Sequence, residues 1–128
     1  MNRVKQAIIA SAVGALEETA AGTVKRRYRF SPDFIGFSGH FPEYPILPAF
    51  IQILTALTLA EEQKGYALKL ARITHAKFHI KLHPDQDIEV ECQEQLVEGQ
   101  AGCKARITTS EGLAASFAMS FAGEEHGA

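Results

Sequence analysis

The hydrophobic positions between residues 48 and 64 follow a helical pattern that is apolar on nearly every side. Pro48 suits the first position of a helix and Gly65 suits its end. A helix with this pattern is normally buried on most of its sides. A polar stripe at Gln52, Thr55 and Thr58 is explained most simply by hydrogen bonds to nearby backbone, with a cavity lining as the alternative. We therefore predict a long buried helix from Pro48 to Lys64.

After this helix the pattern changes to the period of two that is typical of strands. In the first such segment Phe78, Ile80 and Leu82 alternate with Lys77, His79, Lys81 and His83. Similar alternation follows in residues 88–93, 101–107 and 113–121. Turn sequences at residues 97–100 and 110–112 separate the last three segments. The pattern predicts successive antiparallel strands.

The part of the chain before the helix is less clearly patterned. Residues 23–30 are basic and rich in residues that favour strands, whereas Ala7 to Ala20 favours a helix by propensity, with a strand as the alternative. One long buried helix and a run of antiparallel strands, most of which follow it, indicate an α+β class. In such an arrangement the sheet must wrap or cover the helix.

Composition and charge narrow the class of protein further. With 128 residues, 46% hydrophobic and 22% charged, the chain predicts one globular domain over residues 1–128. The formal net charge of −2 argues against binding to nucleic acid or to an anionic membrane surface. The longest apolar run, residues 49–60, is too short and too polar to span about 30 Å of hydrocarbon. We expect neither nucleic acid nor membrane as a partner.

The N-terminus and the two cysteines bear on the compartment. Arg3 and Lys5 precede a weakly apolar stretch that is diluted by alanine, serine and glycine, so we expect no signal peptide and a cytoplasmic protein. Cys92 and Cys103 stand at apolar positions of predicted strands. This placement is typical of small core residues and not of a disulfide or a nucleophilic pair.

The loop before the long helix carries the candidate chemistry. Residues 39–49 read Gly-His-Phe-Pro-Glu-Tyr-Pro-Ile-Leu-Pro-Ala, so three prolines stiffen a segment in which His40 lies near a helix start. An imidazole that titrates near neutrality, beside backbone donors for a developing oxyanion, suits removal of a proton next to a thioester carbonyl. A histidine that merely fills a polar turn is the alternative.

This loop resembles the signature of the 3-hydroxyacyl-acyl carrier protein dehydratases of bacterial fatty acid synthesis. Their Gly-His-Phe-Pro-x-x-Pro-x-x-Pro-Gly loop enters the central helix of a hotdog fold, and residues 76–78 and 83–88 also resemble family segments. Ile46-Leu47-Pro48 and Gln52 are especially similar to the dehydratase-like proteins of aryl polyene and related specialised lipid pathways. The resemblance covers about residues 10–122. It implies a hotdog fold whose first strand lies within the ambiguous N-terminal segment.

The resemblance also implies roles for individual residues. His40 matches the catalytic base, and Ala49 matches the glycine whose backbone amide binds the thioester carbonyl. Leu54 falls where the family has a glutamate or aspartate that works from the opposite subunit, and leucine neither titrates nor donates a proton. Phe41, Leu54 and Phe78 are expected to line a tunnel for the acyl chain. The substrate would arrive on phosphopantetheine, with no other cofactor.

The resemblance supplies partners as well: acyl carrier protein, an acyl thioester, and a second copy of the chain in a homodimer or higher homo-oligomer, or an acid-bearing homologue in a hetero-oligomer. Two groups of basic residues are candidates for a rim that binds the acidic carrier, although a solvated strand face explains them equally well. They are Lys25, Arg26, Arg27 and Arg29, and Lys69, Arg72, Lys77 and Lys81. His75, His79 and His83 suggest no metal site, because strand residues four apart are about 13 Å from one another.

Three functions remain open from the sequence. The first is a 3-hydroxyacyl thioester dehydratase in which His40 removes the alpha proton and water or Glu43 assists the departing hydroxyl. The second is an acyl-thioester hydrolase, because hotdog proteins also include thioesterases. The third is a non-catalytic subunit that pairs with an acid-bearing homologue. The absence of an acid at residue 54 counts against independent dehydration, and the presence of His40 counts against complete loss of activity.

Overall fold

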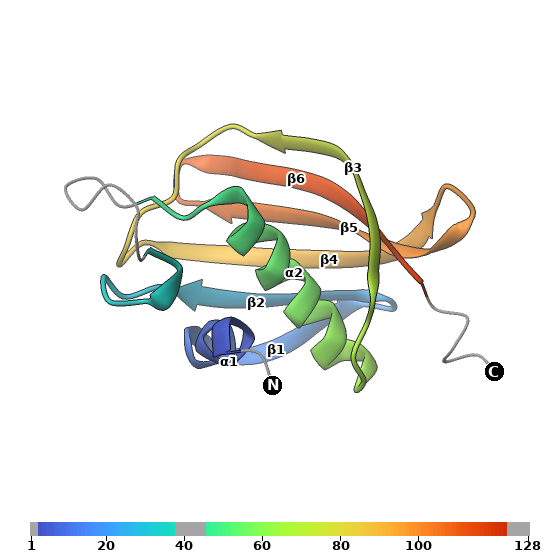
Figure 1. Ribbon diagram of the computed structural model, residues 1–128, viewed down its shortest axis with the longest axis horizontal. Coiled ribbons are helices and arrows are strands. Elements are labelled where there is room, and N and C mark those ends of the chain that lie inside the picture. Colours follow the sequence, from blue (N-terminus) through green and yellow to red (C-terminus); the bar gives the residue numbers. More distant parts are fainter. Residues whose placement is uncertain (1–2, 38–45, 123–128) are drawn as a thin grey trace.

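The computed structural model describes residues 3–37 and 46–122 (Figure 1). The elements in chain order are α1 (Arg3–Ala10), β1 (Ala12–Ala20), β2 (Thr23–Arg29), the short 3₁₀ helix η1 (Ile35–Phe37), α2 (Ala49–Lys64), β3 (Leu70–Phe78), β4 (Asp87–Val97), β5 (Gln100–Thr109) and β6 (Gly112–Phe121). The residues outside these ranges include His40 and Phe41, so what the sequence predicts for them stays a prediction.

All six strands form one antiparallel sheet in the order β1-β2-β4-β5-β6-β3. The sheet curves around α2, which crosses its concave face, and α1 lies beside β1 (Figure 1). Strands β1 and β3 form the two edges of the sheet. The predicted α+β hotdog arrangement, an antiparallel sheet wrapped around one long helix, is confirmed.

The hydrophobic core fills the space between α2 and the concave face of the sheet. Ile51 and Leu59 of α2 are fully buried, as are Val90 of β4 and Met119 of β6. Complete burial of a side chain of this size is worth about 1.5–3 kcal/mol. The helix is buried along most of its length because its sequence is apolar on nearly every side, as predicted.

The ends of α2 and its polar stripe agree closely with the sequence analysis. Gly65 ends the helix in the left-handed conformation (φ 84°), and Pro48 precedes the first helical residue instead of occupying it. The hydroxyls of Thr55 and Thr58 donate to the carbonyls of Ile51 and Leu54 at 2.8 and 2.7 Å. Hydrogen bonding to backbone, the simpler explanation of the stripe, is thus confirmed for both threonines.

The structure of the N-terminal segment differs from the helix that its residue propensities predict. A helix over Ala7 to Ala20 is wrong beyond Ala10, because β1 begins at Ala12 and pairs with β2 along its length. Ser11 separates the two elements, and its hydroxyl donates to the carbonyl of Ala7 at 2.8 Å. Pairing with β2 therefore outweighs the helix propensity of the alanines, as the hotdog resemblance implied.

The strand predicted around residues 77–83 is also shifted. Strand β3 runs from Leu70 to Phe78, so it begins seven residues and ends five residues earlier than the alternating pattern suggests, and the chain after Phe78 leaves the sheet. The expected alternation of burial nevertheless continues, because Leu82 is buried whereas Lys81 is exposed. The pattern identified the apolar face correctly but not the extent of the strand.

Two further expectations concern the cysteines and membrane association. Cys92 and Cys103 are free and buried in the core, as predicted. Neither α1 nor α2, nor any other helical segment in residues 3–37 and 46–122, has the length and apolar character that a bilayer-spanning helix needs.

Candidate functional site

The described part of the predicted site begins where the chain enters α2. Pro48 is extended (φ −63°, ψ 154°), and its carbonyl accepts from the amides of Ile51 and Gln52 at 3.1 and 3.2 Å. The first amides of a helix have no intrahelical acceptor, and Ala49 is exposed. The Ala49 N–H therefore has the character that binding of a carbonyl oxygen requires.

A buried side chain fixes this helix start in place. Gln52 is only 4% exposed, and its Nε2 donates to the carbonyl of Leu47 at 3.1 Å. The amide of Leu47 in turn donates to the carbonyl of Leu82 at 2.8 Å. Because Leu82 lies shortly after β3, this bond ties the helix start to the segment that follows Phe78. The sequence analysis expected Gln52 to form a hydrogen bond with nearby backbone, which this bond confirms, but it did not identify Leu47 as the acceptor.

One polar atom of Gln52 remains unused. Its Oε1 is buried and has no hydrogen-bond partner within the described residues. The orientation of the amide is fixed by chemistry, because the group that faces the carbonyl oxygen of Leu47 must be the donor NH₂. A buried acceptor without a partner costs about 1–3 kcal/mol.

Phe78 ends β3 on the concave side of the sheet. Its ring stacks on that of Phe117 with centroids 6.2 Å apart, and the side chain is 42% exposed. A β-bulge between Thr74 and Lys77 inverts the alternation of β3, so that Phe78 lies opposite Ala115 of the core. Phe78 is therefore an apolar side chain on the helix side of the sheet that remains accessible, as a tunnel wall requires.

Leu54 lies in the second turn of α2. It is half-buried and packs against the core. The two acids of α2 lie about two turns further along, where Glu61 binds Lys5 at 3.0 Å and Glu62 binds Arg26 at 2.9 Å. Neither of these carboxylates can replace an acid at residue 54 within the same chain.

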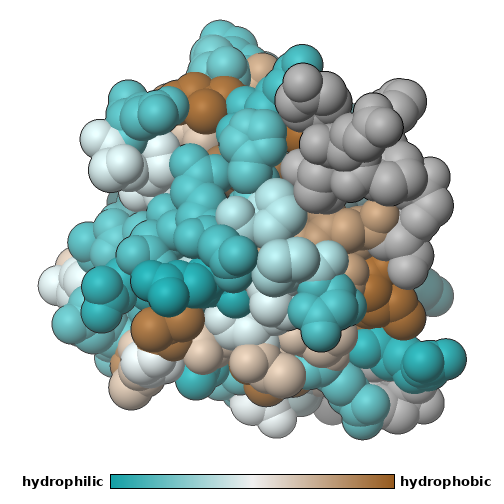
Figure 2. Space-filling model, turned by 90° about the vertical axis from the view of Figure 1, so that its left-hand side faces the viewer, coloured by the Kyte–Doolittle hydropathy of each residue, from teal (hydrophilic) through white to brown (hydrophobic). Residues whose placement is uncertain are grey.

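Apolar surface is exposed near the start of α2. Phe50, the residue after Ala49, is 59% exposed. Figure 2 views the molecule from the side on which α2 begins and shows apolar areas within a largely hydrophilic face. Large exposed aromatic side chains of this kind are typical of surfaces that bind apolar groups or a partner chain.

Comparison with known protein families shows which family this chain belongs to. Residues 16–117 match the ApeI-like family, described as ApeI dehydratase. The matched segment contains all of α2 and all of the strands from β2 to β5. The chain belongs to the ApeI-like dehydratase family.

A relative and two solved structures agree with this membership. A 3-hydroxyacyl-[acyl-carrier-protein] dehydratase from Clostridium novyi is 34% identical over 83 residues, which are 59% of this chain and 58% of the relative. The chain thus spans less than two thirds of the length of that relative. A chain of the dehydratase heterocomplex ApeI:P from Xenorhabdus doucetiae has a TM-score of 0.70 at 20% identity, covering 86% of this chain and 95% of that one. Zebrafish thioesterase superfamily member 2 has a TM-score of 0.63 at 11% identity, covering 89% and 83%. These two structures show that the fold is shared.

Within the ApeI-like fold, the basic residues do not form one continuous rim. The first group lies on β2, and two of the four residues in the second group, Arg72 and Lys77, lie on β3. Three strands separate β2 from β3 in the sheet. Several of these side chains bind acids: Lys25 binds Glu89, Arg26 binds Glu62, Arg29 binds Asp87 and Arg72 binds Glu98. Local ion pairs therefore account for half of the residues proposed to bind an acidic carrier.

The cysteine thiols are not suited to catalysis. The Sγ of Cys92 donates to the carbonyl of Ala56 at 3.3 Å. A hydrogen bond with Cys103 and burial raise the pKa of the Cys92 thiol well above its ordinary value. Because the thiolate is the reactive form, this thiol is unreactive in the folded protein. Within the part of the chain that the structure describes, no group of three histidine, cysteine, aspartate or glutamate residues is arranged to hold a metal ion.

Proposed function

We propose that this protein is a 3-hydroxyacyl thioester dehydratase or a close relative of one, which binds acyl chains carried on the phosphopantetheine arm of acyl carrier protein in the cytoplasm. The observation that carries the proposal is the match of residues 16–117 to the ApeI-like dehydratase family. The amide of the exposed residue Ala49 at the start of α2 and the accessible ring of Phe78 support it, because both fit a thioester with an apolar chain.

The proposed reaction begins at the carbon next to the thioester carbonyl. His40 removes the proton from C2, and the Ala49 N–H donates a hydrogen bond to the carbonyl oxygen as negative charge develops there. The C2 electron pair then forms the double bond to C3 while the C3 hydroxyl departs. That hydroxyl takes up a proton and leaves as water, so the products are a 2-enoyl thioester and water.

The proton for the departing hydroxyl must come from a group other than residue 54. Leucine cannot supply it, and loss of a general acid typically lowers a rate by about 10²- to 10⁴-fold. In this proposal water or Glu43 assists the departure. Dehydration by the isolated chain is therefore slower than dehydration with an acid at residue 54.

Two other functions each have an observation in their favour. A non-catalytic subunit that pairs with an acid-bearing homologue is favoured by Leu54 together with the ApeI:P heterocomplex of Xenorhabdus, a structural neighbour of this chain. An acyl-thioester hydrolase is favoured by the likeness of the fold to zebrafish thioesterase superfamily member 2. The same thioester site serves all three functions.

We also propose that residues 1–128 form a single hotdog domain that assembles at least as a homodimer. The β3 edge of the sheet has exposed side chains along most of its length and presents unpaired backbone groups to a second chain. The exposed rings of Phe50 and Phe78 add apolar surface for association. Sedimentation equilibrium is expected to give at least twice the monomer mass, and a concentration-independent monomer contradicts assembly.

The reaction is tested by following three products separately. The purified protein is incubated with 3-hydroxyacyl and 2-enoyl thioesters while water loss, hydration and thiol release are measured. A dehydratase interconverts the two thioesters, a hydrolase releases thiol, and an idle subunit does neither. Absence of both water loss and hydration in the wild type contradicts the dehydratase proposal.

Substitution at residue 54 sharpens this test. Leu54→Glu supplies the missing acid, whereas Leu54→Gln has nearly the same shape and polarity but no titratable proton. In the dehydratase proposal, Leu54→Glu raises the rate of water loss by about 10²-fold or more and Leu54→Gln does not. Activity that appears only in Leu54→Glu supports the idle-subunit function, because the acid is then the only missing part.

A further inference from the structure

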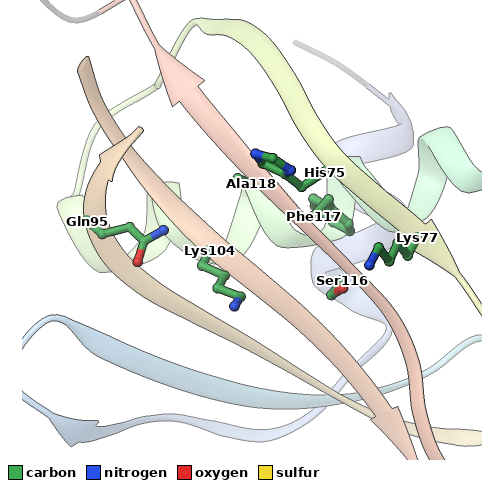
Figure 3. A pocket seen from close by; sticks show the side chains of 7 residues that line it. All are labelled: His75, Lys77, Gln95, Lys104, Ser116, Phe117 and Ala118. Atoms are coloured by element: carbon green, nitrogen blue, oxygen red, sulfur yellow. The ribbon is translucent and has the colours of Figure 1, made fainter. Parts of the chain in front are cut away.

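A pocket lies on the convex face of the sheet, on the side away from α2 (Figure 3). It has a volume of about 250 Å³ and is formed by strands β3 to β6. Five of its seven lining residues are polar, and the other two are Phe117 and Ala118; the polar ones are His75, Lys77, Gln95, Lys104 and Ser116. The neighbouring positions Cys103, Ala105 and Met119 face the core instead, and the pocket meets the proposed thioester site only through Phe117, whose ring is buried and stacks on that of Phe78.

The β-bulge in β3 places two of the lining residues, His75 and Lys77, in this pocket. Thr74 lies opposite Ala118 and Lys77 lies opposite Ser116, so β3 uses three residues where β6 uses two. His75, inside the bulge, has a positive φ of 53°. Without the extra residue, the strand alternation would place Ala76 opposite Ser116 and turn Lys77 towards the core. A strained backbone at His75 thus brings a lysine and a histidine to the convex face.

The pocket is positively charged and has no acidic lining residue. Neither Lys77 nor Lys104 forms a hydrogen bond or ion pair with another described residue, whereas Lys25, Arg26, Arg29 and Arg72 all bind carboxylates. The nearby carboxylate of Glu91 lies 3.9 Å from Arg106, which balances its charge. The pocket therefore retains the charge of two lysines that these acids do not neutralise.

Uncharged hydrogen-bond donors accompany the two lysines. Figure 3 shows the amide of Gln95 on the same side of the sheet as Lys104, and the amine of Lys77 directed towards Ser116. Two ammonium groups with the hydroxyl of Ser116 on the strand between them match an anion that has several acceptor oxygens.

We propose that this pocket binds a phosphate group, either as free phosphate or as the monoester of a small metabolite. A phosphate carries close to two negative charges and three or more acceptor oxygens, which fits Lys77 of β3 and Lys104 of β5 together with Ser116 of the strand between them. A carboxylate offers one charge and fewer acceptors. A second chain that pairs with the β3 edge extends the sheet sideways and leaves this face open.

The proposal is tested by titrating the ¹⁵N-labelled protein with inorganic phosphate and with glycerol 3-phosphate, using acetate at equal ionic strength as the reference anion. Saturable amide shifts are expected at residues 74–77, 104 and 116, with little change in α2. Tighter binding of glycerol 3-phosphate identifies a monoester as the ligand, and equal binding identifies free phosphate. Equal shifts with acetate, or no saturation with either phosphate, overturn the proposal.

Substitutions then assign the binding to the pocket. Lys104→Gln and Lys77→Gln remove one charge each from exposed side chains and are expected to weaken phosphate binding by about ten-fold each. Ser116→Ala removes a hydroxyl and keeps both charges. Lys81→Gln, an exposed lysine outside the pocket, is the matched control and should change the affinity less than two-fold, as expected of a group that does not touch the ligand. If Lys81→Gln and Lys104→Gln weaken phosphate binding equally, the phosphate does not bind specifically in this pocket.

Discussion

The side-chain amide of Gln52 donates to the carbonyl of Leu47 at 3.1 Å, which joins the first turn of α2 to the chain that leads into it. Leu47 is itself held by Leu82 at 2.8 Å. The helix start that carries Ala49 is therefore fixed both by its own helix and by the segment after β3. Rigid support of this kind is what a binding site for a developing oxyanion needs.

Substitution of Gln52 tests this support. Gln52→Glu replaces the donor with a carboxylate that cannot donate to the Leu47 carbonyl and that is buried without a cation. We expect a loss of about 2–4 kcal/mol in the free energy of unfolding near neutral pH, measured by urea denaturation. The loss should shrink in acid, because burial raises the pKa of such a carboxyl and its protonated form is neutral.

The matched control for this substitution lies on the same helix. Gln63→Glu introduces the same charge at a half-buried position in the last turn of α2. Its free energy of unfolding should remain within about 0.5 kcal/mol of the wild type. Equal losses for the two variants contradict a specific role of Gln52 at the helix start.

The second prediction concerns the effect of the β-bulge in β3 on stability. His75 has a φ of 53°, a conformation that glycine adopts without strain. His75→Gly is therefore expected to raise the free energy of unfolding by about 0.5–1 kcal/mol. His79→Gly, at an exposed position without a positive φ, should lower it by a similar amount. Urea denaturation of both variants measures the difference, and destabilisation by His75→Gly contradicts the strain.

The ion pair between β2 and β4 is expected to make the stability of the folded protein depend on pH. The hydrogen bond from Arg29 to Asp87, 2.8 Å long, lowers the pKa of the Asp87 carboxyl. Since the folded-state pKa is the lower one, the stabilisation is fully present above the unfolded pKa and is lost as pH falls through the folded pKa. Asp87→Asn should therefore lower the thermal midpoint slightly near pH 7, and this difference should vanish at about pH 2.

A control separates this pair from a general charge effect. Glu17→Gln removes an exposed carboxylate on β1 that is not part of the Arg29–Asp87 pair, and it should leave the acid dependence unchanged. If Asp87→Asn and the wild type keep the same difference across the whole pH range, the Arg29–Asp87 pair does not contribute as described.

Local pattern was enough to predict α2 and the last three strands. The helix is apolar on nearly all sides and ends at a glycine, and the strands alternate regularly between Asp87 and Phe121. The two-residue turn at Glu98 and Gly99, with positive φ at both, is the kind that short hairpins favour. In these segments local preference and long-range packing agree.

The N-terminus and β3 could not be predicted from local pattern. Residues 12–20 favour a helix by propensity, but their pairing with β2 depends on residues that come later in the chain. In β3 a single extra residue at His75 inverts which side chains face the core, and a period-two sequence pattern gives no sign of such an insertion. Both errors arise where tertiary pairing decides the structure.

The sequence predicted some parts of the candidate site but not others. The resemblance identified Ala49, Leu54 and Phe78, and the structure describes all three on the helix or at the end of β3. Hydrogen bonding of Gln52 to nearby backbone was predicted and is confirmed, but its acceptor, the carbonyl of Leu47, depends on how the chain enters α2, so spacing alone did not identify it. His40 and Phe41 lie outside the described residues, and their roles stay predictions.

The rate at which an enoyl thioester is hydrated measures the proposed chemistry most directly. Wild-type protein and His40→Ala are compared with a 2-enoyl thioester of acyl carrier protein, and the loss of the enoyl group and the appearance of the 3-hydroxyacyl product are both followed. We predict that the wild type catalyses hydration and that His40→Ala lowers its rate by about 10²- to 10⁴-fold, because the general base is gone. Equal rates in the two proteins, or release of thiol without any 3-hydroxyacyl product, would contradict the proposed dehydratase.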